Sequence, residues 1–280
     1  MPFDPQAAGV KWGWRDDIED RHSLKQYASA MPALMMGPIP EVVDPRQDMI
    51  ATGWLPRNQG GEGSCQGNSL ATNIEVCHYI ATGGQLKQFS SDACYYKTQE
   101  MDGIQGDKGS TIWGGVKMSK EYGGVSEELY PSTQQYDPRP FTNAHAEDGG
   151  LHRLYHHIEI TSYDQARDWL GGGLGAIHTG QTWKQSLNDA VVDRFSGRGG
   201  GGHSVTICGY SARKDNDGRP YMIMCNSWGR QFGNDGFAEW APRAVDDILR
   251  DRNTQWYGLS DMADMQQRPW KYTGEGSLLR

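Results

Sequence analysis

The sequence predicts an α+β protein in which helices come first along the chain and strands follow. Between residues 65 and 135 the signals are mostly helical, whereas from residue 151 onward short apolar runs alternate with turns. The chain has 280 residues, which is room for one large domain or for two small domains that share a core. These observations together predict a helical unit packed against a β-rich unit.

The clearest helix is predicted to begin at Cys65. Ser64 precedes it as a suitable N-cap residue, and Gly83 with Gly84 suits its end. Apolar residues recur at positions i, i+4 and i+7, so they form one stripe along the helix. The residues of this stripe are Leu70, Ile74 and Cys77.

The remaining elements follow from similar patterns. A helix is expected at 112–122, where Gly123 and Gly124 stop it, and the polar stretch 132–150 is expected to cross between domains. The expected strands cover 174–178, 204–210, 221–225 and 237–240. The predicted organisation is an N-terminal arm (1–45), a left helical domain (46–135), a crossing segment (136–150), a right β-rich domain (151–264) and a polar tail (265–280).

Cys65 has the sequence surroundings of a reactive thiol. A thiol attacks an amide well only as its thiolate, and both an imidazolium partner and a helix N-terminus lower its pKa. The helix predicted above would supply the second of these. The glycine-rich approach, with Gly60, Gly61 and Gly63, leaves the sulfur little apolar cover. The alternative is a small buried apolar residue, which suits the other four cysteines better.

Three further polar residues are spaced to assist such a thiol. His203 stands at the start of an expected strand, where its ring can take a proton from Cys65. Asn226 follows the next apolar run, and its amide oxygen can accept from the second ring N–H of His203. Gln59, six residues before Cys65, can donate to an oxyanion beside the backbone N–H of Cys65. Taken singly, each of these residues could equally be an ordinary structural residue.

In this order and spacing the motifs resemble the papain-like cysteine peptidases, most closely the prokaryotic and viral branch that lacks the eukaryotic disulfides. The resemblance covers about residues 39–262, and His203 follows Cys65 by 138 residues, within the separation of about 130–150 known for papain. It implies a papain-like α+β fold: a mostly helical left domain, a β-barrel-like right domain and the active-site cleft between them. A second left-domain helix near 89–96 and a last strand near 257–259 are also implied.

The resemblance further implies roles for individual residues. Cys65, His203, Asn226 and Gln59 are the expected catalytic residues. Trp228, in the motif Asn-Ser-Trp-Gly, is expected to shield the bond between His203 and Asn226 from water. The expected substrate-binding residues are Gly109, Ser110, Gly202 and Trp228.

Two positions depart from the family pattern. Gln66 follows the nucleophile, where most papain relatives have an aromatic residue and the prokaryotic branch a small one, so the shape of the substrate subsites is open. Glu62 stands where secreted relatives place a disulfide-forming cysteine. With an odd count of five cysteines, this predicts five thiols, no structural disulfide and synthesis in a reducing compartment.

The N-terminal arm carries a second family-like motif over residues 13–22, beginning Gly-Trp-Arg-Asp-Asp, which is similar to the opening of the prokaryotic branch. No full-length inhibitory propeptide is visible before residue 39. Two interpretations stay open: the arm covers or regulates the cleft, or it simply packs on the body of the protein.

Several other classes of site are disfavoured. A net charge of −8 argues against a nucleic-acid partner, no apolar run is long enough to span a membrane, and the N-terminus lacks the features of a signal peptide. No cofactor or metal is expected: residues 215–218 read as a hairpin turn and not a calcium loop, and His152, His156 and His157 lack further ligands at a suitable spacing. The glycine run 197–202 reads as a mobile rim of the cleft and not as a nucleotide loop.

The leading hypothesis is a thiol endopeptidase acting on a peptide or protein substrate, cytoplasmic in a bacterium or a phage-infected cell. One alternative is a papain-fold structural or interaction protein that is part of a larger assembly such as a phage particle, with a retained or vestigial site. Another is acyl transfer or deamidation by the same residues.

Overall fold

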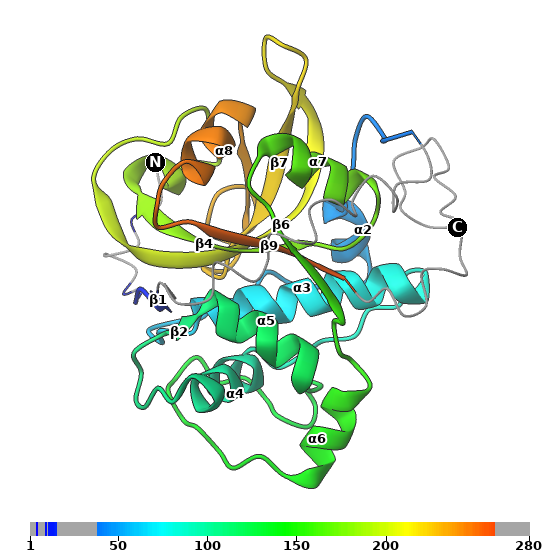
Figure 1. Cartoon of the computed structure of the whole chain (residues 1–280), viewed down its shortest axis with the longest axis vertical. Coiled ribbons are helices and arrows are strands. Elements are labelled where there is room, and N and C mark those ends of the chain that lie inside the picture. Colours follow the sequence, from blue (N-terminus) through cyan, green and yellow to red (C-terminus); the bar gives the residue numbers. More distant parts are fainter. Residues whose placement is uncertain (1–3, 5–8, 10, 16–37, 261–280) are drawn as a thin grey trace.

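The structure is a computed structural model that describes residues 4, 9, 11–15 and 38–260. Figure 1 shows two layers that meet along helix α3 (Cys65–Thr82), with helices on one side of it and a sheet on the other. The polar tail predicted for residues 265–280 and most of the N-terminal arm lie outside the described residues.

Helix α3 begins and ends where the sequence predicts. It runs from Cys65 to Thr82, and its C-cap Gly83 has a φ of 69°, a left-handed conformation that costs glycine little. Ser64 occupies the N-cap position, but its hydroxyl accepts a bond from the side chain of Asn68 at 3.0 Å and caps no backbone N–H. The predicted apolar stripe of α3 packs in one cluster with Val116, which lies in helix α5 (Ile112–Glu121).

The left domain contains three more helices: α4 (Ser91–Asp102), α5 (Ile112–Glu121) and α6 (Asn143–Gly150). The first two lie near the predicted positions. The third, α6, is not among the predicted helices, since it falls inside the stretch expected to cross between domains. Its start is defined by a capping box in which Thr142 and His145 exchange bonds between side chain and backbone.

Within the described residues, seven strands form one sheet in the order β3-β9-β4-β6-β7-β8-β5, antiparallel except for the pair β5–β8. The strands are β3 (His156–Glu159), β4 (Ile177–Lys184), β5 (Val191–Val192), β6 (Gly199–Lys214), β7 (Pro220–Cys225), β8 (Phe237–Trp240) and β9 (Gln255–Ser260). A short 3₁₀ helix, η1 (Gln185–Asn188), follows β4. A separate parallel pair joins β1 (Trp14–Arg15) to β2 (Ser110–Thr111).

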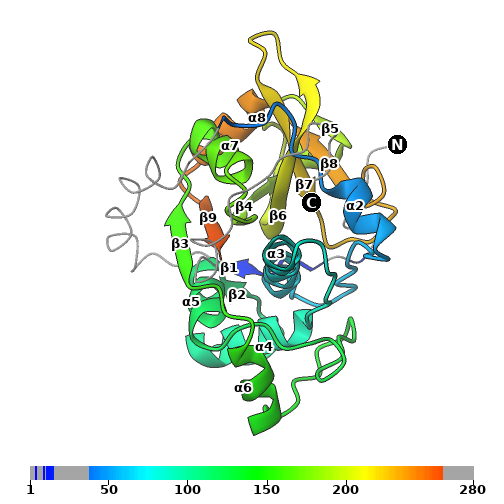
Figure 2. The ribbon, with the colours of Figure 1, turned by 90° about the vertical axis from the view of Figure 1, so that its right-hand side faces the viewer.

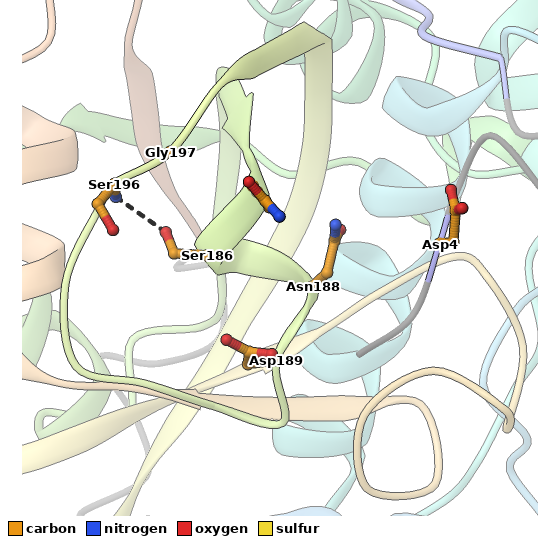
Figure 3. A pocket seen from close by; sticks show the side chains of 7 residues that line it. Asp4, Ser186, Asn188, Asp189, Ser196 and Gly197 are labelled. Atoms are coloured by element: carbon orange, nitrogen blue, oxygen red, sulfur yellow. Dashed lines mark hydrogen bonds between the residues drawn. The ribbon is translucent and has the colours of Figure 1, made fainter. Parts of the chain in front are cut away.

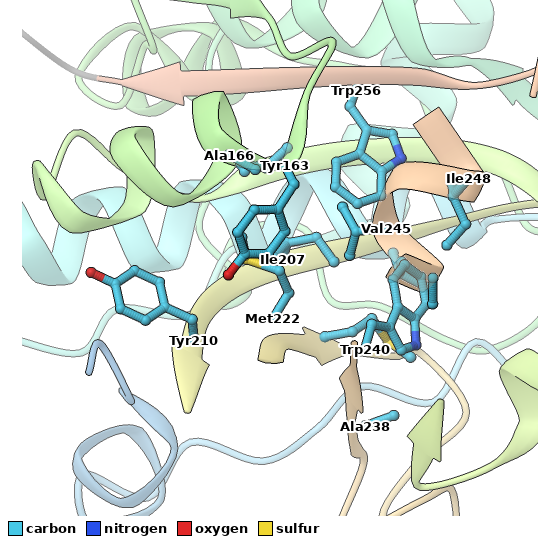
Figure 4. Close-up of a cluster of buried hydrophobic side chains, with 14 of the residues drawn as sticks. Tyr163, Ala166, Ile207, Tyr210, Met222, Ala238, Trp240, Val245, Ile248 and Trp256 are labelled. Carbon is cyan, nitrogen blue, oxygen red and sulfur yellow. The ribbon is translucent and has the colours of Figure 1, made fainter. Parts of the chain in front are cut away.

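Two helices of the right domain, α7 (Tyr163–Gly171) and α8 (Pro242–Leu249), pack on the sheet and close its main core. Figure 4 shows the apolar side chains of these helices and strands pointing toward one another. Burial of this apolar surface is the main source of stability for the domain. The residues of the cluster that Figure 4 labels include Ile207, Met222, Trp240, Val245, Ile248 and Trp256.

Helix α2 (Arg46–Ala51) lies beside the sheet, as Figure 2 shows. Met49 and Trp54 pack in one cluster with Cys208 and Cys225 of the sheet and with Val76 of α3. The left domain is predicted to begin at residue 46. Met49 and Trp54 nevertheless bury their apolar side chains against the strands of the sheet.

The glycine run also differs from its prediction as a mobile rim. Residues 199–202 continue strand β6, where Gly199 and Gly202 pair with Lys184 and Thr182 of β4. The predicted hairpin turn at 215–218 is confirmed, since Gly218 donates its N–H to the carbonyl of Asp215 at 3.1 Å between β6 and β7. None of the described helices has the length and apolar character needed to cross a membrane.

Candidate active site

Cys65 is the first residue of α3 and is fully buried. The first turn of a helix has backbone N–H groups without partners in the helix, and its dipole favours an anion there. One turn later, the carbonyl of Ser69 accepts from the hydroxyl of Thr206 at 2.9 Å. Thr206 lies three residues after His203 on β6, so this bond holds the start of α3 against the strand that carries His203.

His203 makes a hydrogen bond that defines its tautomer. Its Nε2 lies 2.8 Å from Oδ1 of Asn226, and the backbone N–H of Ser227 donates to the same atom at 2.8 Å. Because that atom accepts from a backbone N–H, it is the amide oxygen, and Nε2 must carry the hydrogen. Nδ1 is buried and has no hydrogen-bond partner within the described part of the chain. Burial lowers the pKa of His203 to about 4, although the bond that its ring donates to Asn226 raises it, so the ring is neutral at pH 7.

Gln59 is held on three sides. Its backbone N–H donates to the carbonyl of Ser227 at 2.8 Å, and its Oε1 accepts from the Ser227 hydroxyl at 2.7 Å. Of its Nε2 bonds, one goes to the carbonyl of Glu62 at 2.9 Å and the other to the carbonyl of Lys11 at 3.1 Å. Gln59 thus lies beside the Asn226 motif, with one N–H directed at the carbonyl of Lys11.

Three tryptophans surround the His203 ring. Trp228 stacks on it with the ring centroids 4.6 Å apart, as the prediction that it shields this residue requires. Trp183 of β4 meets the ring edge-on at 4.8 Å, and Trp12 does so at 5.9 Å. Nothing in the sequence pattern pointed to Trp183 or Trp12, because a tryptophan in a strand or an irregular arm is ordinarily a packing residue.

Residues 11–15, which we call the cleft segment, pass through the site. The carbonyl of Gly13 accepts from the backbone N–H of Ser110 at 2.8 Å, and the chain then forms β1 beside β2. The fit is close: a Cβ added to Gly13 would lie 1.7 Å from the carbonyl oxygen of Gly63, and one added to Gly201 would lie 2.3 Å from Trp12 Cγ. The segment therefore fills the space between the left and right domains at this point.

The expected substrate-binding residues lie around the same segment. A Cβ on Gly109 would lie 1.7 Å from the Gly13 oxygen, Ser110 bonds to Gly13 as above, and Trp228 meets Trp12 at 6.0 Å between ring centroids. Gly202 lies on β6 and directly precedes His203. Three of the four predicted positions thus contact the cleft segment.

Two carboxyl groups hold the loop that leads to Cys65. Asp107 accepts from the backbone N–H of Gly63 at 2.8 Å through Oδ1, and Glu62 accepts from the Tyr96 hydroxyl at 2.6 Å. Burial raises the pKa of Glu62 to about 7, although the bonds from Tyr96 and Ser64 lower it. In the described chain none of the five cysteines forms a disulfide. The bond between Glu62 and Tyr96 of α4 connects this loop to the helix.

A hollow of about 630 Å³ lies beside η1, and Figure 3 shows the polar side chains that line it. None of the four expected catalytic residues is among them. The lining residues are Asp4, Gln185, Ser186, Asn188, Asp189, Ser196 and Gly197. In the described residues no group of three His, Cys, Asp or Glu is arranged to hold a metal ion.

Comparisons with known proteins identify the family of this chain. The profile of the papain family of cysteine proteases matches residues 39–251, and the chain belongs to this family. It is 37% identical over 211 residues to the cathepsin B-like protein CP3 of Giardia intestinalis, covering 71% of this chain and 63% of that one. It is 27% identical over 209 residues to a cathepsin L-like proteinase of Phaedon cochleariae, covering 73% and 61%. The chain thus spans about three-fifths of the length of these relatives.

Solved structures show the same fold. Xylellain, a cysteine protease from Xylella fastidiosa, superposes with a TM-score of 0.69 at 18% identity and covers 90% of this chain and 96% of its own. Bromelain from Ananas comosus gives a TM-score of 0.58 at 17% identity and covers 79% and 99%. The papain-like α+β fold predicted from the sequence is confirmed.

Proposed function

We propose that this protein hydrolyses peptide bonds through a Cys65–His203–Asn226 site with Gln59 as an oxyanion donor. The observation that carries the proposal is the state of His203. Its Nε2 is committed to Asn226, which leaves Nδ1 as a buried acceptor with no partner in the described chain. A ring fixed in this way, on the strand that Thr206 bonds to helix α3, is suited to take a proton from a thiol.

In the first step Nδ1 of His203 takes the thiol proton of Cys65, and the thiolate attacks the carbonyl carbon of the substrate. The electron pair of the C=O bond moves to oxygen. The backbone N–H of Cys65 and Nε2 of Gln59 then donate to that oxyanion. As the intermediate collapses, the C–N bond breaks and His203 returns its proton to the leaving amine.

In the second step water replaces the amine. His203 takes a proton from water, and the hydroxide attacks the thioester carbon. The C–S bond breaks, which releases the carboxylic acid, and His203 returns its proton to the Cys65 sulfur to restore the thiol. Throughout both steps Asn226 keeps the imidazole in the required orientation. Trp228, stacked on the His203 ring, keeps water from the bond between His203 and Asn226.

The cleft segment has to move before a substrate can bind. The carbonyl of Lys11 already accepts from Gln59 Nε2, and Trp12 covers the edge of the His203 ring. A peptide that placed its own carbonyl at Gln59 would overlap this segment. Displacement of residues 11–13 is therefore part of the proposed reaction cycle.

The test is covalent labelling combined with turnover. A thiol-directed epoxide should modify the protein once, at Cys65, and both labelling and hydrolysis of a fluorogenic peptide should vanish in Cys65→Ala. Cys77→Ala, which changes a buried cysteine in the middle of α3, should keep both and lose only stability. Turnover by Cys65→Ala at an unchanged melting temperature would disprove the nucleophile. Mass spectrometry of the products separates hydrolysis from acyl transfer, since only hydrolysis adds water.

A further inference from the structure

We propose that Asp107 makes this site select a lysine or arginine on the acyl side of the cleaved bond. The proposal rests on the peptidase activity proposed above and names the class of substrate for it. It starts from one contact, the ion pair between Asp107 and Lys11 of the cleft segment.

The two carboxylate oxygens of Asp107 have different partners: Oδ1 is bonded within the body of the protein, and Oδ2 faces the cleft segment. Its Oδ1 accepts from the backbone N–H of Gly63 at 2.8 Å and from the hydroxyl of Tyr95 at 3.1 Å. These bonds orient the group beside the loop that ends at Cys65. Its Oδ2 lies 2.7 Å from Nζ of Lys11. The side chain is only 14% exposed, so the paired ammonium replaces much of the water that a carboxylate requires.

Lys11 shows how far a basic side chain reaches in this site. Its carbonyl oxygen lies 3.1 Å from Nε2 of Gln59, the proposed oxyanion donor, while its ammonium pairs with Asp107. A single lysine therefore spans the distance between the oxyanion donor and this carboxylate. The residue on the acyl side of a substrate presents its carbonyl to the same donor, and a lysine or arginine there can reach the same carboxylate.

The neighbouring carboxyl group does not compete for this role. Glu62 is 1% exposed and accepts from the hydroxyl of Tyr96, so a substrate cation cannot reach it. The structural task of Asp107 requires only Oδ1, which an asparagine side chain can supply through its amide oxygen. The charge on Oδ2 is thus separable from the support of the Cys65 loop.

The experiment uses the full chain and two fluorogenic peptides that differ only in the acyl-side residue, lysine in one and uncharged norleucine in the other. Both compete in one reaction, and the ratio of their kcat/KM values is measured. The cleft segment blocks both peptides equally, so the ratio does not depend on how often it opens. We expect a preference of about 10- to 100-fold for lysine, the range of a charged hydrogen bond.

Asp107→Asn should bring the ratio close to one while hydrolysis of the norleucine peptide continues. Asp137→Asn, which removes the same charge from an exposed position, should leave the ratio unchanged. A ratio near one in the wild type, or an unchanged ratio in Asp107→Asn, would overturn the proposal. Absence of hydrolysis of either peptide would instead contradict the peptidase function. In that event the affinities of Cys65→Ala for the two peptides decide the role of Asp107, and equal affinities reject it.

Discussion

Gln59 has two amide hydrogens, and each has a different acceptor. One bonds to the carbonyl of Glu62 within its own loop, and the other points to the carbonyl of Lys11. Its oxygen is held by the hydroxyl of Ser227. With the side chain held in this way, the second hydrogen has the fixed orientation that the proposed oxyanion role requires, since preorganised donors stabilise a transition state.

We therefore expect Gln59→Ala to lower kcat by about 10²–10³ with KM little changed, because the bond strengthens mainly in the transition state. Gln59→Glu is the matched variant: it keeps the size and the acceptor for Ser227 but loses the N–H. It should be at least as impaired. Both are measured as kcat and KM on one fluorogenic peptide, and full activity of Gln59→Glu would rule out the donor role.

Glu62 should make stability depend on pH. Burial raises its pKa from 4.5 to about 7, so the folded state binds its proton more tightly than the unfolded state does. Its contribution is complete below pH 4.5 and is lost as the pH rises through about 7, by up to about 3 kcal/mol at roughly 1.4 kcal/mol per unit.

Glu62→Gln keeps an acceptor for Tyr96 and does not titrate. Between pH 5 and pH 8 the free energy of unfolding in urea should therefore fall by about 2–3 kcal/mol more in wild type than in this variant. Glu128→Gln, at an exposed position, should show no such change. The same difference between Glu62→Gln and wild type at both pH values would contradict the assignment.

The cleft segment is the element that has to move in the proposed reaction cycle. It is anchored at its two ends by Lys11 bonded to Asp107 and by β1 paired with β2, and between them Gly13 lies against Gly63. The close approach depends on the absence of a side chain at Gly13, where a Cβ would overlap a backbone oxygen. A single methyl group should therefore displace the segment without touching the catalytic residues.

Gly13→Ala should raise kcat/KM on a short peptide by about 10-fold or more, through a lower KM at unchanged kcat, because the open form becomes more populated. Gly150→Ala is the control, since a Cβ at Gly150 meets nothing within 4 Å. Unchanged KM in Gly13→Ala, with a normal melting temperature, would show that the segment does not limit access.

Across the whole molecule, the layers meet around a buried histidine. His178 of β4 bonds through Nδ1 to the hydroxyl of Ser69 on α3 at 2.8 Å, and its Nε2 lies 3.1 Å from where a Cβ on Gly115 of α5 would stand. Burial lowers its pKa from 6.5 to about 3. The ring is therefore neutral when folded, and a charge there would face the joint between the helices and the sheet.

Since the folded pKa is depressed, the contribution of His178 to stability is present above pH 6.5 and is lost as the pH falls toward 3. Wild type should lose about 2–3 kcal/mol from this residue between pH 6.5 and pH 4.5. His178→Gln should have a flatter dependence in urea unfolding, whatever its absolute stability, whereas exposed His156→Gln should follow wild type. Parallel curves for His178→Gln and wild type would contradict this.

Local patterns carried the sequence predictions that the structure confirms. Helix α3 has its apolar stripe within the eighteen residues it spans and its glycine stop directly after them, and strand β8 coincides with its apolar run at 237–240. Helix α6 is not predicted because its eight residues include Asn, Asp and two Gly, which favour helices poorly, and only its capping box shows where it begins. The rim glycines 199–202 were misjudged because pairing with β4 holds them in β6.

The sequence by itself determined the family, the four positions of the candidate site and their order along the chain, because a motif is a local arrangement of residue types. Only the tertiary structure decided that Lys11 meets both Gln59 and Asp107, that Trp183 and Trp12 enclose His203, and that the cleft holds a segment of its own chain. These contacts join residues that are distant along the chain. They exist because two layers pack around α3, and no local pattern records how layers pack.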